Sequence, residues 1–210
     1  MHRRLTEHLR GLFFAVALLG AAVTPAHAAD PTATVMLVAT PKLADPIYRA
    51  SVLVASPLAD GRFVGFIINK PTRLTLGQAF PEHAPSKKVV DPIFLGGPEQ
   101  ANKLFALVQR EKSPGRGSMR LSPDLFLVLA GDTVDQVIEQ DPEHARFLFG
   151  AVIWQPGELD SEIRRGAWFV EEPDTEVMMR KETGKLWQEL LQRRGVEGGG
   201  EGGGSRRGYI

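Results

Sequence analysis

The chain is a succession of short apolar runs separated by turn residues, and this pattern predicts a fold rich in short strands. Residues 147–170 form its clearest unit. An apolar, β-prone run ends at Trp154, a polar stretch follows, and a second apolar run begins at Ala167. Pro156 stands where the first residue of a helix is expected, and Gly166 can adopt the left-handed conformation that ends one. The unit is therefore predicted to be a strand, a helix and a strand.

The other short apolar runs predict further strands. These strands are expected at residues 34–39, 48–55, 63–68, 91–95, 104–108, 125–130 and 176–179. The Asp60-Gly61 pair, between two of these runs, is a hairpin signal. Helices are expected at residues 132–140, where Asp132 can act as the N-cap, and at residues 184–194. One or two further helical turns are expected at residues 74–80.

Residues 1–28 have the three parts of a secretory signal peptide. Three arginines precede an uncharged apolar run at residues 11–23, and Ala26-His27-Ala28 matches the small-x-small pattern of a cleavage site. The apolar run is short for a membrane-spanning helix, which needs about 20 residues. We therefore expect cleavage after Ala28 and export to the periplasm. The alternatives are an uncleaved anchor, or a cytoplasmic protein whose start has been misread.

Charge and cysteine content narrow the functional classes. Removing residues 1–28 would take away three of the 25 Lys and Arg and one of the 25 Asp and Glu, leaving 22 against 24. This balance argues against nonspecific binding to nucleic acid and gives no electrostatic attraction to an anionic membrane. The chain has no cysteine, which excludes a cysteine nucleophile and thiolate metal ligands. We expect no nucleic-acid partner and no stable membrane insertion after cleavage.

Four blocks of sequence resemble a known family in their order and spacing. An apolar strand with an Asp-Pro-x-Tyr step lies at residues 36–54, and GFIINKPT lies at residues 65–72. A Gly-Gly-Pro turn lies within residues 94–98, and GAVIWQPGELDSEIRRGAW spans residues 150–168. From residue 36 to residue 195 the chain is similar to the YqgE/AlgH family of bacterial proteins.

The resemblance implies a single compact α+β domain, with a strongly bent, barrel-like sheet flanked by helices. It also implies a connection with regulation, notably of alginate production, although the family has no established biochemical activity. Its members usually lack a signal peptide, so this chain departs from the family at its N-terminus. The expected division is a signal peptide at residues 1–28, a YqgE/AlgH-like domain at residues 29–195 and a flexible Gly-rich tail at residues 196–210.

The placement of histidines limits the catalytic possibilities. Of the five histidines, three lie within residues 1–28, so only His83 and His144 would remain after cleavage. A zinc site with three histidines is then excluded, and no Gly-x-Ser-x-Gly nucleophile motif occurs. The glycine-rich segments lack the spacing of dinucleotide and Walker loops. The sequence therefore predicts no catalytic residue, no metal site and no cofactor.

Polar residues at one strand end and two glycines at a turn indicate a candidate binding surface. Asn69 and Lys70 follow an apolar strand directly, and such positions often line ligand sites. The alternative is a purely structural role, in which Asn69 and Lys70 only terminate the strand. Gly96 and Gly97 could offer N–H groups to an anion. A tight turn with positive φ is the more favoured explanation of this pair.

Carboxylates complete the candidate surface. Glu158 and Glu162 are four residues apart and share one helix face, and Asp45 lies in the loop after the first strand. A carboxylate pair can serve acid–base catalysis or hold a hard cation, but a capped and salt-bridged helix is favoured. The preferred function is an exported, non-catalytic binding or regulatory protein whose partner is a protein or a small ligand. A hydrolase or metal-assisted enzyme using these three carboxylates, and a cytoplasmic regulator, remain alternatives.

Overall fold

The computed structural model describes residues 33–196, so the expected signal peptide and nearly all of the expected tail lie outside this part. Its strands are β1 (Val35–Ala39), β2 (Val52–Pro57), β3 (Phe63–Ile67), β4 (Pro71–Thr75), β5 (Pro92–Leu95), β6 (Glu99–Gln109), β7 (Ser118–Ser122), β8 (Leu125–Val128), β9 (Ala145–Trp154) and β10 (Trp168–Glu171). Its helices are α1 (Leu76–Ala79), α2 (Gly131–Gln140), α3 (Glu158–Arg164), α4 (Thr175–Met179) and α5 (Leu186–Arg193), with 3-10 turns η1 (Ala84–Lys88) and η2 (Pro142–His144). None of the helices within residues 33–196 is long and apolar enough to span a membrane.

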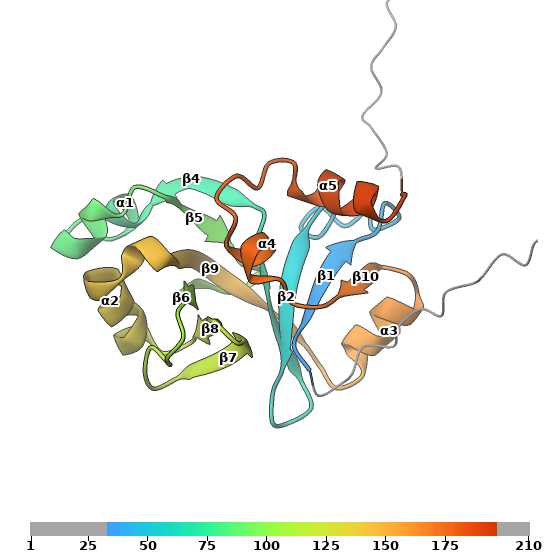
Figure 1. Ribbon diagram of the computed structural model, residues 1–210, viewed down its shortest axis with the longest axis horizontal. Coiled ribbons are helices and arrows are strands. Elements are labelled where there is room, and N and C mark those ends of the chain that lie inside the picture. The colour runs from blue at the N-terminus through green and yellow to red at the C-terminus, as the bar shows by residue number, and fades with distance from the viewer. Residues whose placement is uncertain (1–32, 197–210) are drawn as a thin grey trace, which may run out of the picture.

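Strand β9 joins the two halves of one bent sheet (Figure 1). Its last residues, Val152 to Trp154, pair with β3 in the half ordered β10-β1-β2-β3. Its earlier part pairs with β6 in the half ordered β6-β8-β7, and with β5, which pairs in turn with β4. These pairs are antiparallel except for β5 with β9, which is parallel. Because β9 contributes to both halves, it sets their mutual arrangement.

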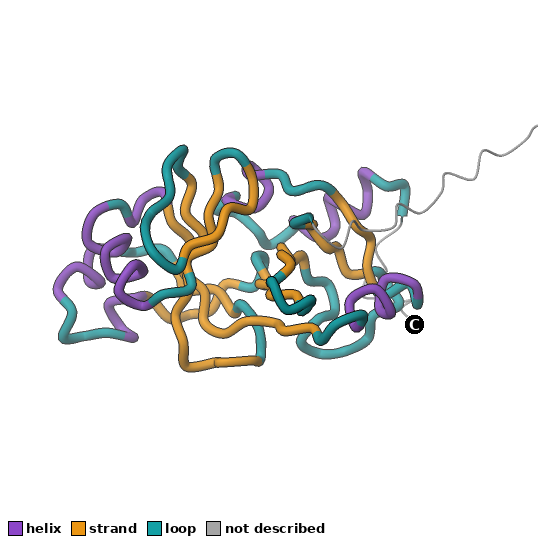
Figure 2. The backbone as a smooth tube through the Cα atoms, turned by 90° about the horizontal axis from the view of Figure 1, so that it is seen from below, coloured by secondary structure: helices purple, strands orange, loops and turns teal. Residues whose placement is uncertain are grey.

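Alternation along the strands divides the core into an inner layer and two outer layers. Val38 of β1 faces the inside of the bend together with α4 and α5, whereas Leu37 faces outward with α3. In the other half, Leu107 of β6 faces inward and Ala106 faces outward with α2. Figure 2 shows the strands in the middle of the molecule and helices at both ends. Strands β1, β3 and β8 bury both faces, and this explains why they are continuous apolar runs in the sequence.

Gly150 interrupts the alternation inside β9. Leu148 and Ala151 both face the inner core although they are three positions apart, which would put them on opposite faces of a regular strand, and Gly150 between them has a φ of 74°. A bulge of this kind shifts the phase of a strand and bends it. As a result, the outward face of β9 contributes Phe147 to the outer core of one half and Val152 to that of the other.

The main predictions of the sequence are confirmed. The strand, helix and strand of residues 147–170 correspond to β9, α3 and β10. Gly166 follows the C-terminal end of α3 with a φ of 76°. The Asp60-Gly61 hairpin joins the antiparallel strands β2 and β3, and Gly61 has a φ of 81°. The expected fold class, a single α+β domain with a bent sheet flanked by helices, is the fold observed.

Two predictions about helix starts and strands are wrong. Residues 175–179 form α4 and not a strand, because Asp174 caps the helix by accepting a hydrogen bond from Val177 N–H at 3.1 Å. Pro156 does not open α3. Gly157, in a left-handed conformation, is the N-cap, so the proline belongs to the turn before the helix.

The remaining differences concern element ends and two missed strands. Asp132 lies in the first turn of α2, but the N-cap is Ala130. The strand expected at residues 48–55 begins only at Val52, because residues 46–50 form turns. Strands β4 and β7 are not predicted by the pattern, since their sequences PTRLT and SMRLS contain few apolar residues.

Candidate functional site

Asn69 fixes the loop that precedes β2. Its side chain accepts a hydrogen bond from Val52 N–H at 2.8 Å and donates one to the Ala50 carbonyl at 2.9 Å. Ala50 has a φ of 54°, which is unfavourable for a residue with a Cβ atom. The two hydrogen bonds from one amide stabilise the chain on both sides of this conformation.

Asp45 and Lys70 complete the same loop. One carboxylate oxygen of Asp45 accepts hydrogen bonds from Ile47 N–H at 2.8 Å and Tyr48 N–H at 3.2 Å. The Lys70 ammonium donates to the Ile47 carbonyl. Burial is the main reason why the pKa of Lys70 is lowered, and Asp45 acts in the opposite direction. Together with Asn69, these candidates surround one loop.

Glu162 holds two buried tryptophans. Its Oε2 accepts a hydrogen bond from Trp154 Nε1 at 3.0 Å and another from Trp168 Nε1 at 2.7 Å. Tyr48 packs edge-on against Trp168, with 6.2 Å between the ring centroids. Burial, followed by the charges of Asp45 and Glu162, raises the pKa of Tyr48 to about 12. The loop of Asp45 and helix α3 therefore meet at Tyr48.

The candidate residues on this surface have structural roles. Glu158 Oε2 accepts a hydrogen bond from Gln155 N–H at 2.8 Å at the start of α3, and its charge also raises the pKa of Tyr48. Around Tyr48 the fold thus brings together Asp45, Asn69, Lys70, Glu158 and Glu162. Each of these side chains has at least one polar atom bonded to a neighbouring loop, helix or indole group, so the surface is well braced.

Gly96 and Gly97 are buried against β9. Gly96 N–H donates to the Phe149 carbonyl at 2.7 Å, so this group is not free for an anion. A methyl group at Gly97 would lie 2.2 Å from the Ala151 carbonyl oxygen. Neither glycine has a positive φ, so the explanation by a left-handed turn is wrong. Close approach to the bulge at Gly150 is what requires glycine here.

The two histidines of the described chain make local contacts. His83 Nδ1 lies 2.7 Å from Ser86 Oγ, and His83 Nε2 lies 3.8 Å from a Glu139 carboxylate oxygen. These are the residue types of a hydrolase triad, but Ser86 is 0% exposed, so its hydroxyl does not reach solvent. His144 Nδ1 lies 2.6 Å from Asp141 Oδ1. Within residues 33–196, no group of three or more His, Cys, Asp or Glu side chains is arranged to hold a metal ion.

Arg146, near the start of β9, is a buried cation that is not among the residues expected from the sequence. Only 6% of the residue is exposed. Nη1 donates to the carbonyls of Ile68 at 2.9 Å and Met178 at 2.7 Å, and Nη2 donates to the carbonyl of Arg180. The guanidinium carbon lies 4.3 Å from the centroid of the Phe94 ring. Burial lowers the pKa of Arg146 to about 10, so the side chain remains a cation at neutral pH.

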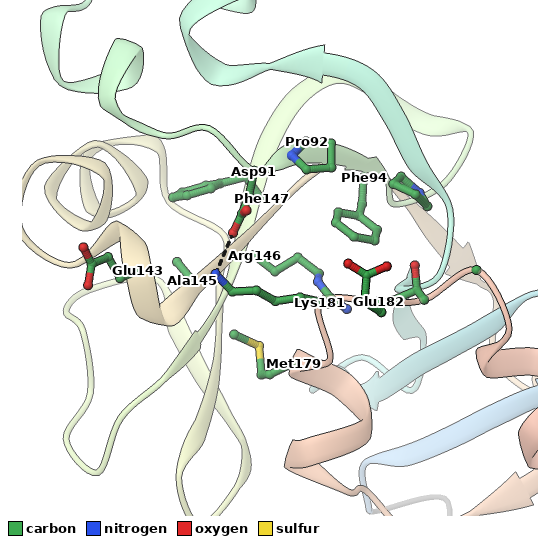
Figure 3. Close-up of a pocket in the computed structure, with 13 residues that line it drawn as sticks. Asp91, Pro92, Phe94, Glu143, Ala145, Arg146, Phe147, Met179, Lys181 and Glu182 are labelled. Carbon is green, nitrogen blue, oxygen red and sulfur yellow. Dashed lines mark ion pairs between the residues drawn. The ribbon is translucent and has the colours of Figure 1, made fainter.

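A cavity of about 420 Å³ lies beside Arg146, between β5, β9 and the segment that joins α4 to α5 (Figure 3). Its apolar wall includes Pro92, Phe94, Phe147 and Met179. At its rim, Lys181 Nζ lies 3.3 Å from Asp91 Oδ2, the ion pair dashed in Figure 3. We call this cavity the Arg146 pocket. Its volume is in the range typical of small-molecule sites.

Two polar groups that line the pocket have unused hydrogen-bonding capacity. Thr183 is 3% exposed, and its hydroxyl has no hydrogen-bond partner within residues 33–196. In the same part of the chain, Arg146 uses three of its five N–H groups, and no carboxylate lies within ion-pair distance of it. Because buried polar groups are almost always bonded, this combination indicates a place for a polar ligand.

A signal for Arg146 was present in the sequence. The strand was expected to begin at Phe147, which left Arg146 outside the sheet. Extending the strand to Ala145 and counting back from the inward-facing Leu148 in steps of two places Arg146 inside the bend. An arginine at an inward position of an apolar strand is unusual and points to a special role. Thr183 offers no such signal, because its burial depends on how the segment after α4 folds back.

Comparison with known proteins identifies relatives along most of the described chain. The model of the AlgH-like family, DUF179, matches residues 36–198. A UPF0301 protein of Methylococcus capsulatus is 33% identical over 165 residues, which cover 76% of this chain and 90% of that protein. A UPF0301 protein of Myxococcus xanthus is 30% identical over 166 residues, which cover 77% and 90% respectively.

Solved structures share the fold. The solution structure of the AlgH protein from Pseudomonas aeruginosa has a TM-score of 0.64 and 23% identity, covering 78% of this chain and 88% of that one. The crystal structure of protein DIP2367 from Corynebacterium diphtheriae has the same TM-score and 20% identity, covering 78% and 87%. The resemblance carried by four sequence blocks is thereby confirmed, and the chain belongs to the AlgH-like family.

Proposed function

We propose that this protein is a non-catalytic binding protein with a regulatory role, and that it binds a small ligand in the Arg146 pocket. One observation carries the proposal: a buried cation, without a carboxylate partner within residues 33–196, lines a cavity of about 420 Å³. Buried charges are normally paired, and a ligand with polar groups would supply the partner. The surface around Tyr48 has less to offer a ligand, because its polar side chains are already bonded to the protein.

Methionine methyl groups provide a direct test. Met179 lines the Arg146 pocket, whereas Met119, on β7, does not. In the ¹³C-methyl-methionine spectrum of the full chain, we expect at least one class in a panel of carboxylates, amines, sugars and nucleotides to shift the Met179 signal. The shift should saturate with concentration and leave Met119 unchanged. If no compound moves Met179, or if Met119 moves equally, the pocket is not a ligand site.

We also propose that the protein is exported. The support is the three-part pattern of residues 1–28, which lie outside the described structure. Cell fractionation followed by mass spectrometry of the N-terminus should find a periplasmic chain that begins at Ala29. A cytoplasmic chain that keeps residues 1–28 would favour the alternative of a regulator inside the cell.

An enzyme using Asp45, Glu158 and Glu162 has weaker support. Glu162 Oε2 already accepts two indole N–H groups, and Glu158 Oε2 accepts a backbone N–H group. Protonating or withdrawing either carboxylate would therefore disturb the packing of α3. A divalent cation that raises the melting temperature of the wild type but not of Glu158→Gln would restore this alternative.

A further inference from the structure

We infer that the Arg146 pocket selects a small carboxylate with an apolar body, an inference that rests on the proposed function of this pocket as a ligand site. Arg146 is the buried charge of the pocket, so a ligand that enters should carry a negative group. Nε–H and one further N–H of Arg146 have no partner within residues 33–196. A planar carboxylate can accept two N–H groups of a guanidinium at once.

Thr183 supports the same ligand chemistry. Thr183 lines the pocket, and its hydroxyl is buried and has no partner in the described part of the chain. A hydroxyl can donate one hydrogen bond, and a carboxylate oxygen can accept it. Thr183 and Arg146 thus offer donors of two kinds to one anionic group. A cationic amine without an acceptor oxygen would leave these donors unbonded, and a neutral acceptor would leave the charge of Arg146 without a counter-ion.

The rest of the lining limits the size and charge of the ligand. Phe94, Phe147 and Met179 provide an apolar wall, which favours a hydrocarbon body. The rim carries the carboxylates of Asp91, Glu143 and Glu182. With Arg146 and Lys181, the lining holds three negative and two positive side chains, and this balance disfavours a ligand with several negative charges.

Two kinds of molecule carry this chemistry. One is a simple aliphatic monocarboxylate. The other is a free amino acid with an apolar side chain, whose ammonium group would approach the acidic rim. Asp91 is the rim carboxylate to implicate, because its charge acts on Arg146 and its one ion pair within residues 33–196 is with the exposed Lys181.

The test compares three molecules of similar shape in the full chain: 4-methylpentanoate, leucine and 3-methylbutylamine. We expect 4-methylpentanoate, leucine or both to shift the Met179 methyl signal, with the amine binding at least about tenfold more weakly, because one charge-assisted hydrogen bond contributes about that factor. Tighter binding of leucine would identify an amino acid as the source, and tighter binding of 4-methylpentanoate would identify a plain carboxylate. Binding of the amine as strongly as the carboxylates would overturn the inference while leaving a ligand site in place.

Thr183 is the residue to change, because removing Arg146 endangers the fold. Thr183→Val should weaken binding of the preferred carboxylate by about threefold to tenfold, since it removes one hydrogen bond to an ion. Thr183→Ser, the matched control, keeps the hydroxyl and should bind within about twofold of the wild type. If the valine and serine variants bind the carboxylate equally well, the role assigned to the hydroxyl is wrong and the inference fails.

Discussion

Glu162 and Arg146 are two charged side chains of opposite sign that the fold treats in different ways. Glu162 lies on the outer side of one half of the sheet, where two indole N–H groups donate to one of its oxygens. Arg146 lies inside the bend, where three backbone carbonyls accept from it. Both charges are therefore held by neutral dipoles, and neither has an ion-pair partner within residues 33–196.

The difference lies in what surrounds each charge. Tyr48 and the two tryptophans pack around Glu162, so its hydrogen bonds serve to fix α3 on the sheet. Arg146 lines a cavity together with Thr183, whose hydroxyl has no hydrogen-bond partner within residues 33–196. A charge held by neutral dipoles is thus no sign of a binding site by itself. The sign is a buried charge that keeps unbonded donors within the described chain and lines a space large enough for a ligand.

The largest effect is expected from Arg146→Met. The carbonyls of Ile68, Met178 and Arg180 would lose their donor, and buried acceptors without partners are strongly destabilising. We expect the free energy of unfolding to fall by about 3–5 kcal/mol, measured by urea denaturation. Arg120→Met is the matched control, because Arg120 is exposed yet also lies over a phenylalanine ring and donates to two carbonyls. Equal losses for both variants would show that burial of Arg146 is not what matters.

The next effect is expected from Glu162→Ala. It leaves the indole N–H groups of Trp154 and Trp168 without an acceptor, and unfolding free energy should fall by about 2–3 kcal/mol. Glu162→Gln keeps an acceptor oxygen and should lose about 1 kcal/mol. Glu158→Ala, on the same helix face, removes one exposed contact and should also lose about 1 kcal/mol or less. A loss from Glu162→Ala no larger than that from Glu158→Ala would contradict a structural role for Glu162.

Sequence reasoning recovered the elements whose burial follows from local pattern. Strands β1, β3 and β8 bury both faces, so their apolar runs are continuous and bounded by turn residues. It failed at residues 175–179, where Val177 and Met178 are apolar but Asp174 and a short connection favour one helical turn. The phase shift at Gly150 was also beyond prediction, because it depends on the approach of Gly97 from a distant part of the chain.

The residues of the candidate site also divide into those that local sequence predicts and those that only the fold brings together. The residues around Tyr48 could be predicted because strand ends and helix starts have local signals, and the fold brings them together. Their hydrogen bonds show that polar residues at strand ends and helix starts can serve to stabilise the adjoining loops. Arg146 and Thr183 lie 37 positions apart in the sequence, and only the fold of α4 over the inner face brings them to one cavity.

A smaller effect should appear at alkaline pH through Tyr48, and it tests how far the charge of Glu162 reaches. The pKa of Tyr48 is raised from 10.0 to about 12, so the folded chain keeps the phenolic proton after the unfolded chain has lost it. The resulting stability is complete below pH 10 and is lost as the pH rises toward 12. The loss between pH 9 and pH 11 should be smaller in Tyr48→Phe than in the wild type, measured by urea denaturation.

Absorbance titration measures the pKa of Tyr48 directly. The chain has two tyrosines, so Tyr209→Phe leaves Tyr48 as the only one. In that background, Glu162→Gln should lower the pKa of Tyr48, because the Glu162 charge contributes to raising it. If Glu162→Gln leaves the titration unchanged, the carboxylate is shielded from Tyr48 and the two residues do not form one electrostatic unit.

The smallest effect on stability is expected from Thr183→Val, and it addresses the Arg146 side of the comparison. Valine has nearly the same shape as threonine, and the hydroxyl it replaces has no partner within residues 33–196. The free energy of unfolding should stay constant or rise by up to about 1 kcal/mol. Thr133→Val is the matched control, because Thr133 is similarly buried, at 4% exposure, but donates to the Arg116 carbonyl at 2.7 Å. That variant should lose about 1–2 kcal/mol. If Thr183→Val loses as much stability, the Thr183 hydroxyl supports the fold. Thr183 would then no longer distinguish the surroundings of Arg146 from those of Glu162, and only the unbonded N–H groups of Arg146 would do so.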